Sequence, residues 1–153
     1  MNRQQKGLDP LAILMADDDE DDRQMARDAL AATRVRNPIH AVSDGEELLD
    51  YLFRRGRYED PANSPRPGLI LLDLNMPRLS GREALTVIKQ DPELRQIPVL
   101  VLTTSEAEED ILQSYQLGAN SFISKPVTFD GLVRVMGSLK NFWLEIVELP
   151  GEA

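Results

Sequence analysis

The feature that most constrains this chain is a repeated alternation of short apolar runs with longer amphipathic segments. The five runs, each interpreted as a strand, are "LAILMA", "PIHAV", "LILLD", "PVLVLT" and "SFIS", which begin at Leu11, Pro38, Leu69, Pro98 and Ser121. Apolar residues at helical spacing between and after them predict helices. Strands that are apolar on both faces and separated by helices indicate a parallel sheet covered on both sides. Right-handed connections then give a doubly wound (βα)5 α/β fold.

The helices are expected in five places. One spans about Asp19 to Ala32, and one runs from "SDGE" through Phe53. A third follows "NMPRLSG" and closes near "DPEL", a fourth ends at Gly118, and the last runs from about Phe129 into the 140s. The segments "SDGE" (Ser43 to Glu46) and "SEAE" (Ser105 to Glu108) have the spacing of a capping box.

Length predicts a single domain, because 153 residues suffice for one hydrophobic core. We assign residues 11–147 to it, with a flexible N-terminus over 1–10 and a tail over 148–153. The segment from Arg54 to Gly68 is rich in proline, glycine and charge. It is interpreted as a surface insertion, since the sheet must continue after it.

Charge and composition exclude several classes of protein. A net charge of −9 argues against binding to nucleic acid, whose partners carry clustered Lys and Arg. With no cysteine, the chain has neither disulfides nor thiolate metal sites. Its polar start does not read as a secretory signal, and its apolar runs are too short to span a membrane. We therefore expect a cytoplasmic protein.

Polar residues follow the predicted strands at the point where each one ends. In open parallel sheets, ligands bind beyond the carboxyl ends of the strands. Carboxylate and carbonyl oxygens there suit a hard cation such as Mg²⁺, and a carboxylate can also act as a nucleophile toward phosphorus. Lysine and a hydroxyl group can hold phosphoryl oxygens. The strand-end residues are Asp17, Asp18, Asp19, Asp73, Asn75, Thr103 and Lys125.

Four of these motifs, in this order, resemble the receiver domain of bacterial two-component response regulators. They are Asp17-Asp18, "LLDLNMP" with Asp73, Thr103, and "SKP" with Lys125-Pro126. The resemblance covers about Leu11 to Leu139 and implies a flavodoxin-like receiver fold, a five-stranded parallel sheet of order 2-1-3-4-5. "PRPGLILLDLNMPRLSGREAL" and the late "FWLEIV" are also similar to the stand-alone regulators that partner bacterial and cyanobacterial phytochromes.

The resemblance implies a role for each residue of a metal site. Asp73 would accept the phosphoryl group and bind the metal. Asp18 would be a direct ligand, Asp17 would act through a metal-bound water, and the backbone carbonyl of Asn75 would be the third protein ligand. The cation would be Mg²⁺, although Mn²⁺ or Ca²⁺ could occupy the same site.

The resemblance also implies a phosphoryl clamp and a switch. Lys125 would pair with the acceptor carboxylate, and its bond to Pro126 would be cis. Thr103 would bind a phosphoryl oxygen, and Phe122 would turn inward as Thr103 moves. Thr104 departs from the small residue that many receivers have there, and we expect it to slow hydrolysis.

We expect this chain to accept a phosphoryl group from a sensor histidine kinase of phytochrome type. The chain itself would not be an enzyme. The signal would leave through contact with a downstream protein, with no role for nucleic acid or membrane. Alternatively, the chain is a phosphate shuttle or sink in a phosphorelay. The apolar end, with Phe142 and Trp143, predicts a homodimer. In the alternative, Trp143 folds back onto its own domain.

Blander interpretations exist for the same residues. Asp73 alone could cap a turn, and Asp19 to Asp22 fit a helix N-terminus. Asp17, Asp19 and Asp21 have the spacing of a calcium loop, but its turn glycine is missing. Asp17 and Asp19 also match the motif of haloacid-dehalogenase-type phosphatases, which would leave "LLDLNMP" unexplained. A dinucleotide-binding domain fails for lack of phosphate-binding glycines. The lone histidine, His40, is interpreted as a packed strand residue rather than a phosphorelay donor.

Overall fold

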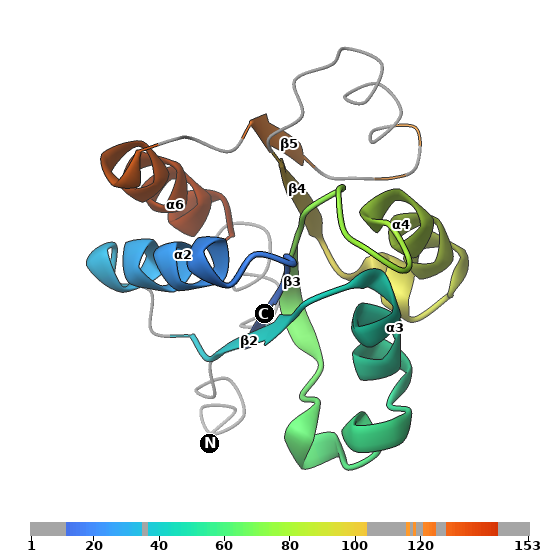
Figure 1. The fold of residues 1–153 in the computed structure, drawn as a ribbon. Helices are drawn as coiled ribbons and strands as arrows, with labels where there is room; N and C mark the ends of the chain where they lie inside the picture. The colour runs from blue at the N-terminus through green and yellow to red at the C-terminus, as the bar shows by residue number, and fades with distance from the viewer. Residues whose placement is uncertain are drawn as a thin grey trace, which may run out of the picture.

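The core of the molecule is a parallel sheet, seen edge-on at the centre of Figure 1. The computed structural model describes residues 12–34, 37–103, 116, 118, 121–124 and 128–143. The sheet order is β2-β1-β3-β4-β5, and every pairing is parallel. The strands are β1 (Ala12–Ala16), β2 (Ile39–Val42), β3 (Pro67–Leu72), β4 (Val99–Thr103) and β5 (Ser121–Ser124).

Helices cover both faces of this sheet, as a doubly wound fold requires. One layer consists of α2 (Glu20–Ala32) and α6 (Phe129–Trp143), and the other of α3 (Gly45–Phe53) and α4 (Gly81–Gln90) (Figure 1). Short 3-10 turns, η1 (Gly56–Tyr58), η2 (Pro61–Asn63) and η3 (Leu94–Gln96), lie in the connections. The predicted α/β class with a parallel sheet is confirmed.

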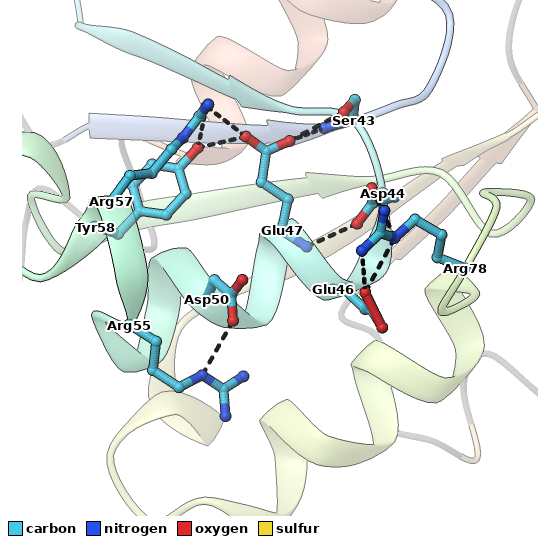
Figure 2. Close-up of a pocket in the computed structure, with 9 residues that line it drawn as sticks. All are labelled: Ser43, Asp44, Glu46, Glu47, Asp50, Arg55, Arg57, Tyr58 and Arg78. Carbon is cyan, nitrogen blue, oxygen red and sulfur yellow. Dashed lines mark hydrogen bonds and ion pairs between the residues drawn. The ribbon is translucent and has the colours of Figure 1, made fainter.

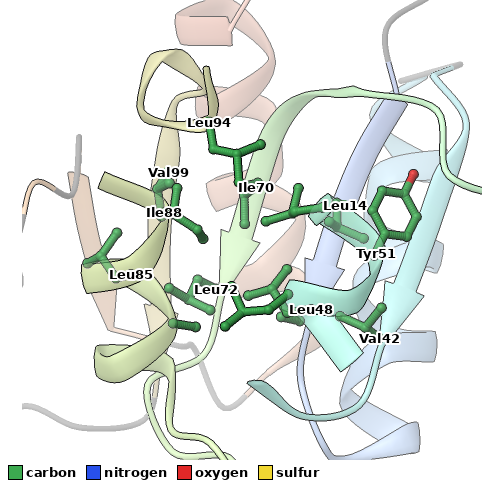
Figure 3. Packing of buried hydrophobic residues seen from close by; sticks show 14 of the residues in the cluster. Leu14, Val42, Leu48, Tyr51, Ile70, Leu72, Leu85, Ile88, Leu94 and Val99 are labelled. Carbon is green, nitrogen blue, oxygen red and sulfur yellow. The ribbon is translucent and has the colours of Figure 1, made fainter. Parts of the chain in front are cut away.

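Alternate residues of β1, β3 and β4 pack into two separate cores. Leu14, Ile70, Leu72 and Val99 face α3 and α4 (Figure 3), whereas their neighbours along the strands face α2 and α6. β3 is buried along its whole length, which explains why "LILL" is apolar without alternation. Burying one such leucine contributes about 1.5–3 kcal/mol, so the central strands hold their register firmly.

The predicted starts of β2 and β4, at Pro38 and Pro98, are each one residue early, and further differences concern β3 and α3. β3 begins at Pro67 rather than Leu69, because proline is tolerated at the first residue of a strand, where its missing N–H is not needed. The capping box at Ser43 and Glu46 is displaced by one residue: Asp44 is the N-cap of α3 and accepts from the Glu47 amide at 2.7 Å. Asp44 can take this position because its backbone is extended, and its carboxylate suits the helix dipole.

Several predictions lie outside the described residues. They concern the two ends of the chain, the capping box at Ser105, Thr104, and the Lys125–Pro126 bond. Of the helix expected between β4 and β5, only residues 116 and 118 are described. None of the helices in the described part of the chain combines the length and apolarity that crossing a bilayer requires.

The predicted insertion is an ordered cap on the end of α3. Tyr58 and Ser64 are buried, and Ser64 Oγ donates to the Tyr58 carbonyl at 2.9 Å. The Tyr58 ring lies 5.2 Å from that of Tyr51, whose hydroxyl donates to the Pro65 carbonyl at 2.7 Å. Burial raises the pKa of Tyr51 to about 12, so this hydroxyl keeps its proton. His40 lies in β2 with its ring 6.0 Å from Tyr51, as a packed strand residue would.

Candidate functional site

Strand register places Asp17 beside Asp73. β1 and β3 pair in parallel up to Ala16 and Leu72, so the next residue of each strand reaches the same edge of the sheet. The Asp73 amide donates to the Ala16 carbonyl at 3.0 Å, and the Asp17 amide donates to the Val42 carbonyl at 3.1 Å. These backbone hydrogen bonds to neighbouring strands therefore fix the positions of Asp17 and Asp73 at the edge of the sheet.

Three carboxylates converge at this edge. Asp17, Asp18 and Asp73 each offer an oxygen within 4.8 Å of the others. Asp17 and Asp73 are only 6% and 8% exposed, whereas Asp18 is exposed to solvent. Buried like charges repel, and a bound cation offsets that repulsion. All the donors of the cluster are oxygens, which fits a hard divalent cation.

The Asp19 amide donates to Asp17 Oδ1 at 3.0 Å, but the Asp19 carboxylate has a role of its own. Asp19 is the N-cap of α2, and its Oδ1 accepts from the amides of Asp21 and Asp22 at 2.8 and 3.3 Å. The first turn of α2 carries Glu20, Asp21 and Asp22, where the helix dipole favours negative charge. Because the Asp19 carboxylate caps α2, the geometry supports neither a calcium loop nor the phosphatase motif. The prediction that Asp19 to Asp22 form a helix N-terminus is confirmed.

The loop from Asp73 to Ser80, here called the β3–α4 loop, is tightly held. The Asn75 amide donates to Asp73 Oδ1 at 3.1 Å, and the Gly81 amide donates to the Leu74 carbonyl at 3.0 Å. A Cβ at Gly81 would lie 2.2 Å from the Asp73 carbonyl oxygen, so only glycine fits there. The end of the loop thus returns to the backbone of Asp73 and Leu74, where the loop begins.

The remaining predicted residues are placed only in part. Thr103 is the last residue of β4 and pairs with Ser124, while Phe122 pairs with Val101. Phe142 and Trp143 lie in the last turn of α6. Lys125 follows β5 directly in sequence and lies outside the described residues.

A polar pocket lies beside the site, between the start of α3 and the insertion (Figure 2). Glu47 is its centre, accepting from Tyr58 Oη at 2.5 Å, Arg57 Nη2 at 2.6 Å, and the amide and hydroxyl of Ser43 at 2.8 and 3.0 Å. Burial raises the pKa of Glu47, but these hydrogen bonds and the Arg57 charge outweigh it and leave the pKa below its ordinary value. Glu47 therefore joins β2, α3 and the insertion as an anion.

Sequence reasoning missed three residues near the site. Arg23 Nη1 donates to the Asp17 carbonyl at 2.7 Å and holds the β1–α2 turn. Arg78 of the β3–α4 loop pairs with Glu46 of α3, and Gly45 contacts Leu79 of the same loop. The position of Gly45 was an available signal: glycine is enriched after helix C-termini, so a glycine in a first turn indicates close backbone approach.

Comparison with known sequences gives a consistent result. Residues 13–136 match the response regulator receiver domain. The chain is 40% identical over 141 residues to response regulator Rcp1 of Synechocystis sp., an alignment that covers 92% of this chain and 94% of Rcp1.

Solved structures agree with the sequence match. The phosphorylated cyanobacterial phytochrome response regulator RcpA is 41% identical with a TM-score of 0.81, covering 88% of this chain and 94% of RcpA. The Mn²⁺-bound form of Rcp1 is 40% identical, also with a TM-score of 0.81, covering 90% and 97% of the two chains. Regulator RPA3017, from red light signalling in R. palustris, is 36% identical with a TM-score of 0.83, covering 90% and 95%.

Proposed function

The chain belongs to the response regulator receiver domain family, and from that premise we propose that it accepts a phosphoryl group on Asp73 from a sensor histidine kinase. The observation that carries the proposal is the position of Asp73. Its carboxylate lies at the carboxyl edge of the sheet, within 4.8 Å of oxygens of Asp17 and Asp18. A nucleophile beside a cation site is the arrangement that phosphoryl transfer to a carboxylate needs.

We propose that the cation is Mg²⁺, held by Asp18, Asp73 and the backbone carbonyl of Asn75, with Asp17 acting through a water. The all-oxygen donor set supports this choice, and the same set would also accept Mn²⁺ or Ca²⁺. Rcp1, a relative, has been solved with Mn²⁺ bound. When bound, the cation would neutralise charge on the carboxylates and on the phosphoryl oxygens.

The proposed transfer is a displacement at phosphorus. An oxygen of the Asp73 carboxylate attacks the phosphorus of the kinase phosphohistidine, forming an O–P bond. The P–N bond breaks, and its electron pair stays on the imidazole of the kinase. The Asn75 amide, 3.1 Å from Asp73 Oδ1, keeps the carboxylate oriented during the attack. Water later attacks the phosphorus, which releases inorganic phosphate and regenerates Asp73.

Lys125 would supply positive charge to the acceptor site and then to the phosphoryl group. Thr103 would donate its hydroxyl to a phosphoryl oxygen, and Phe122 would respond to that movement. Thr103 lies in β4, which pairs with β3, and Phe122 lies in β5, which pairs with β4, and this chain of strands supports a shared response. The resulting change would bias a two-state surface that a downstream protein reads.

The proposed kinase is a bacterial phytochrome. Support comes from RcpA, whose name describes a cyanobacterial phytochrome response regulator, and from the red-light regulator of R. palustris. We propose that residues 11–147 form one receiver domain and that it assembles as a homodimer through the end of α6 with Phe142 and Trp143.

The first prediction tests this function with acetyl phosphate as phosphodonor. Intact mass spectrometry should show a gain of one phosphoryl group with Mg²⁺ and none with chelator. Asp73→Asn should abolish the gain, because an amide is not the required nucleophile. Asp18→Ala should remove the response to Mg²⁺. The control is Asp130→Asn, an exposed carboxylate of α6 that should react normally. Phosphorylation of Asp73→Asn at the wild-type level would refute the proposal.

A further inference from the structure

The β3–α4 loop rests on the first turn of α3 through a backbone contact. The Gly45 amide donates to the Leu79 carbonyl at 3.0 Å. A Cβ at Gly45 would lie 2.1 Å from that carbonyl oxygen and 2.8 Å from the Leu79 Cβ. Real Cβ atoms do not approach backbone this closely, so a side chain at position 45 must push the loop away from α3.

A charged contact reinforces the same junction, as Figure 2 shows. Arg78 Nε donates to Glu46 Oε1 at 3.0 Å, and the same guanidinium lies 3.6 Å from Asp44 Oδ2. Arg78 has a φ of 69°, in the left-handed region that arginine seldom adopts. The pair is exposed and therefore weak by itself. The Arg78–Glu46 pair orients the loop, while the contact at Gly45 sets the distance between the loop and α3.

The first turn of α3 is itself braced from both sides. Asp44 caps it, and Glu47 binds Ser43 at the end of β2 together with Arg57 and Tyr58 of the insertion. At the other end, the β3–α4 loop is anchored by Gly81 and by Leu74, which is fully buried. The stretch between these anchors contains Asn75.

We propose that the first turn of α3 positions the metal-binding carbonyl of the β3–α4 loop, with Gly45 and Arg78 as positioning residues. The inference rests on the proposed function, since it takes the Asn75 carbonyl as a ligand. Neither Gly45 nor Arg78 touches the cation. Both set where Asn75 stands relative to the carboxylates of Asp18 and Asp73.

The test is titration of the chelator-treated protein with Mg²⁺ and, separately, with Ca²⁺ by calorimetry. Gly45→Ala should weaken Mg²⁺ binding by about 10- to 100-fold, the range seen when supporting residues around a metal site are changed. Ca²⁺ binding should weaken less, because Ca²⁺ accepts irregular geometry and Mg²⁺ does not. General destabilisation would not change the ratio of the two affinities, so this ratio isolates a positioning role.

Matched controls come from the chain itself. Gly137→Ala also adds a methyl group within a helix, but its Cβ would lie 3.8 Å from Thr33 Cγ2, an ordinary contact, so both affinities should stay unchanged. Arg78→Gly removes the guanidinium and still accepts the positive φ. The matched control for this variant is Arg34→Gly. Arg34 is also exposed and has a φ of 63°, but it lies after the C-terminal end of α2. We expect Mg²⁺ binding about 2- to 5-fold weaker for Arg78→Gly, as for loss of an exposed ion pair, and unchanged for Arg34→Gly.

The possible outcomes distinguish failure of this inference from failure of the proposed metal-dependent function. Wild-type protein without Mg²⁺ binding would refute the metal site itself, and the inference with it. Wild-type binding with a folded Gly45→Ala that matches Gly137→Ala in both affinities would overturn only the inference. If Gly45→Ala does not fold, the arginine pair decides: equal Mg²⁺ affinity in Arg78→Gly and Arg34→Gly overturns the inference.

Discussion

Glu47 illustrates how one residue joins parts of the chain that the sequence keeps apart. Its carboxylate accepts hydrogen bonds from Ser43, Arg57 and Tyr58, and the Arg57 guanidinium lies 4.9 Å from the centre of the Tyr58 ring. Side-chain exposure is 20% for Glu47 and 74% for Arg57, so water competes for the Arg57 contact more than for those of Ser43 and Tyr58. Charged hydrogen bonds of this kind are stronger than neutral ones. Glu47 therefore stabilises the insertion as well as α3.

The second prediction concerns Glu47→Gln and acid unfolding. The pKa of Glu47 is lower in the folded protein than its ordinary value of 4.5, so its contribution is present above pH 4.5 and is lost as pH falls through the folded pKa. At neutral pH the substitution should lower the free energy of unfolding by about 1–3 kcal/mol, because the partly buried donors of Ser43 and Tyr58 lose a charged acceptor. Below pH 4.5 the difference from wild type should shrink.

Urea unfolding at a series of pH values measures both effects. Glu59→Gln is the matched control, since Glu59 is an exposed carboxylate of the insertion. Its free energy of unfolding should match that of wild type at every pH. A Glu47→Gln deficit that stays constant from neutral pH to pH 3 would contradict an ionised role for Glu47.

The carboxylates of the site could be predicted from sequence because each directly follows an apolar strand. Asp17 and Asp73 are placed by strand register, and register follows from the apolar pattern of "AILMA" and "LILLD". The role of Glu47 could not be predicted, because its partners Arg57 and Tyr58 lie in a segment with neither helical nor strand periodicity. Their contacts depend on how that segment folds back in three dimensions.

At the scale of elements, the starts of α3 and α4 show how well a capping box can be predicted from sequence. In α4, Ser80 Oγ accepts from the Glu83 amide at 3.2 Å, and Glu83 accepts from the Ser80 amide at 3.0 Å. This complete capping box was not predicted, although "SGRE" has the required spacing. The box that was predicted at Ser43 is displaced, because Asp44 is the better acceptor for the first turn of α3. Spacing alone does not choose between adjacent candidate caps.

The third prediction is that Ser80→Ala lowers the free energy of unfolding by about 0.5–2 kcal/mol through loss of the cap. Hydrogen exchange should become faster in the first turn of α4, where the Glu83 amide loses its acceptor. Ser80→Thr keeps a hydroxyl acceptor and serves as the control. Unchanged exchange at the Glu83 amide in Ser80→Ala would show that the capping box contributes nothing.

At the scale of the whole molecule, the fold was the most predictable property. β1, β3 and β4 are apolar on both faces and require cover there, which α2 with α6 and α3 with α4 provide (Figure 1). The insertion was predicted as a surface loop and is an ordered cap, because Tyr58 and Ser64 bury themselves against α3. Lys140 adds a long-range tie, donating from α6 to the Thr33 carbonyl at 3.1 Å.

The fourth prediction concerns assembly. Sedimentation velocity at several concentrations should show a dimer that dissociates on dilution, because an apolar sequence such as the one that begins at Phe142 is typical of an interface. Trp143→Ala should shift the population toward monomer. Phe129→Ala, an exposed aromatic at the opposite end of α6, should leave the dimer unchanged. A monomer at every concentration of the wild-type protein would contradict the proposed homodimer.

The central claim is that Asp73 itself carries the phosphoryl group, and chemical trapping tests it most directly. Borohydride reduces an aspartyl phosphate to homoserine, so peptide mass spectrometry after phosphorylation can locate the modified residue. We predict homoserine at position 73 in protein treated with phosphodonor and Mg²⁺, and intact aspartate there when chelator is present. Homoserine at Asp17 or Asp18, with Asp73 unmodified, would contradict the account.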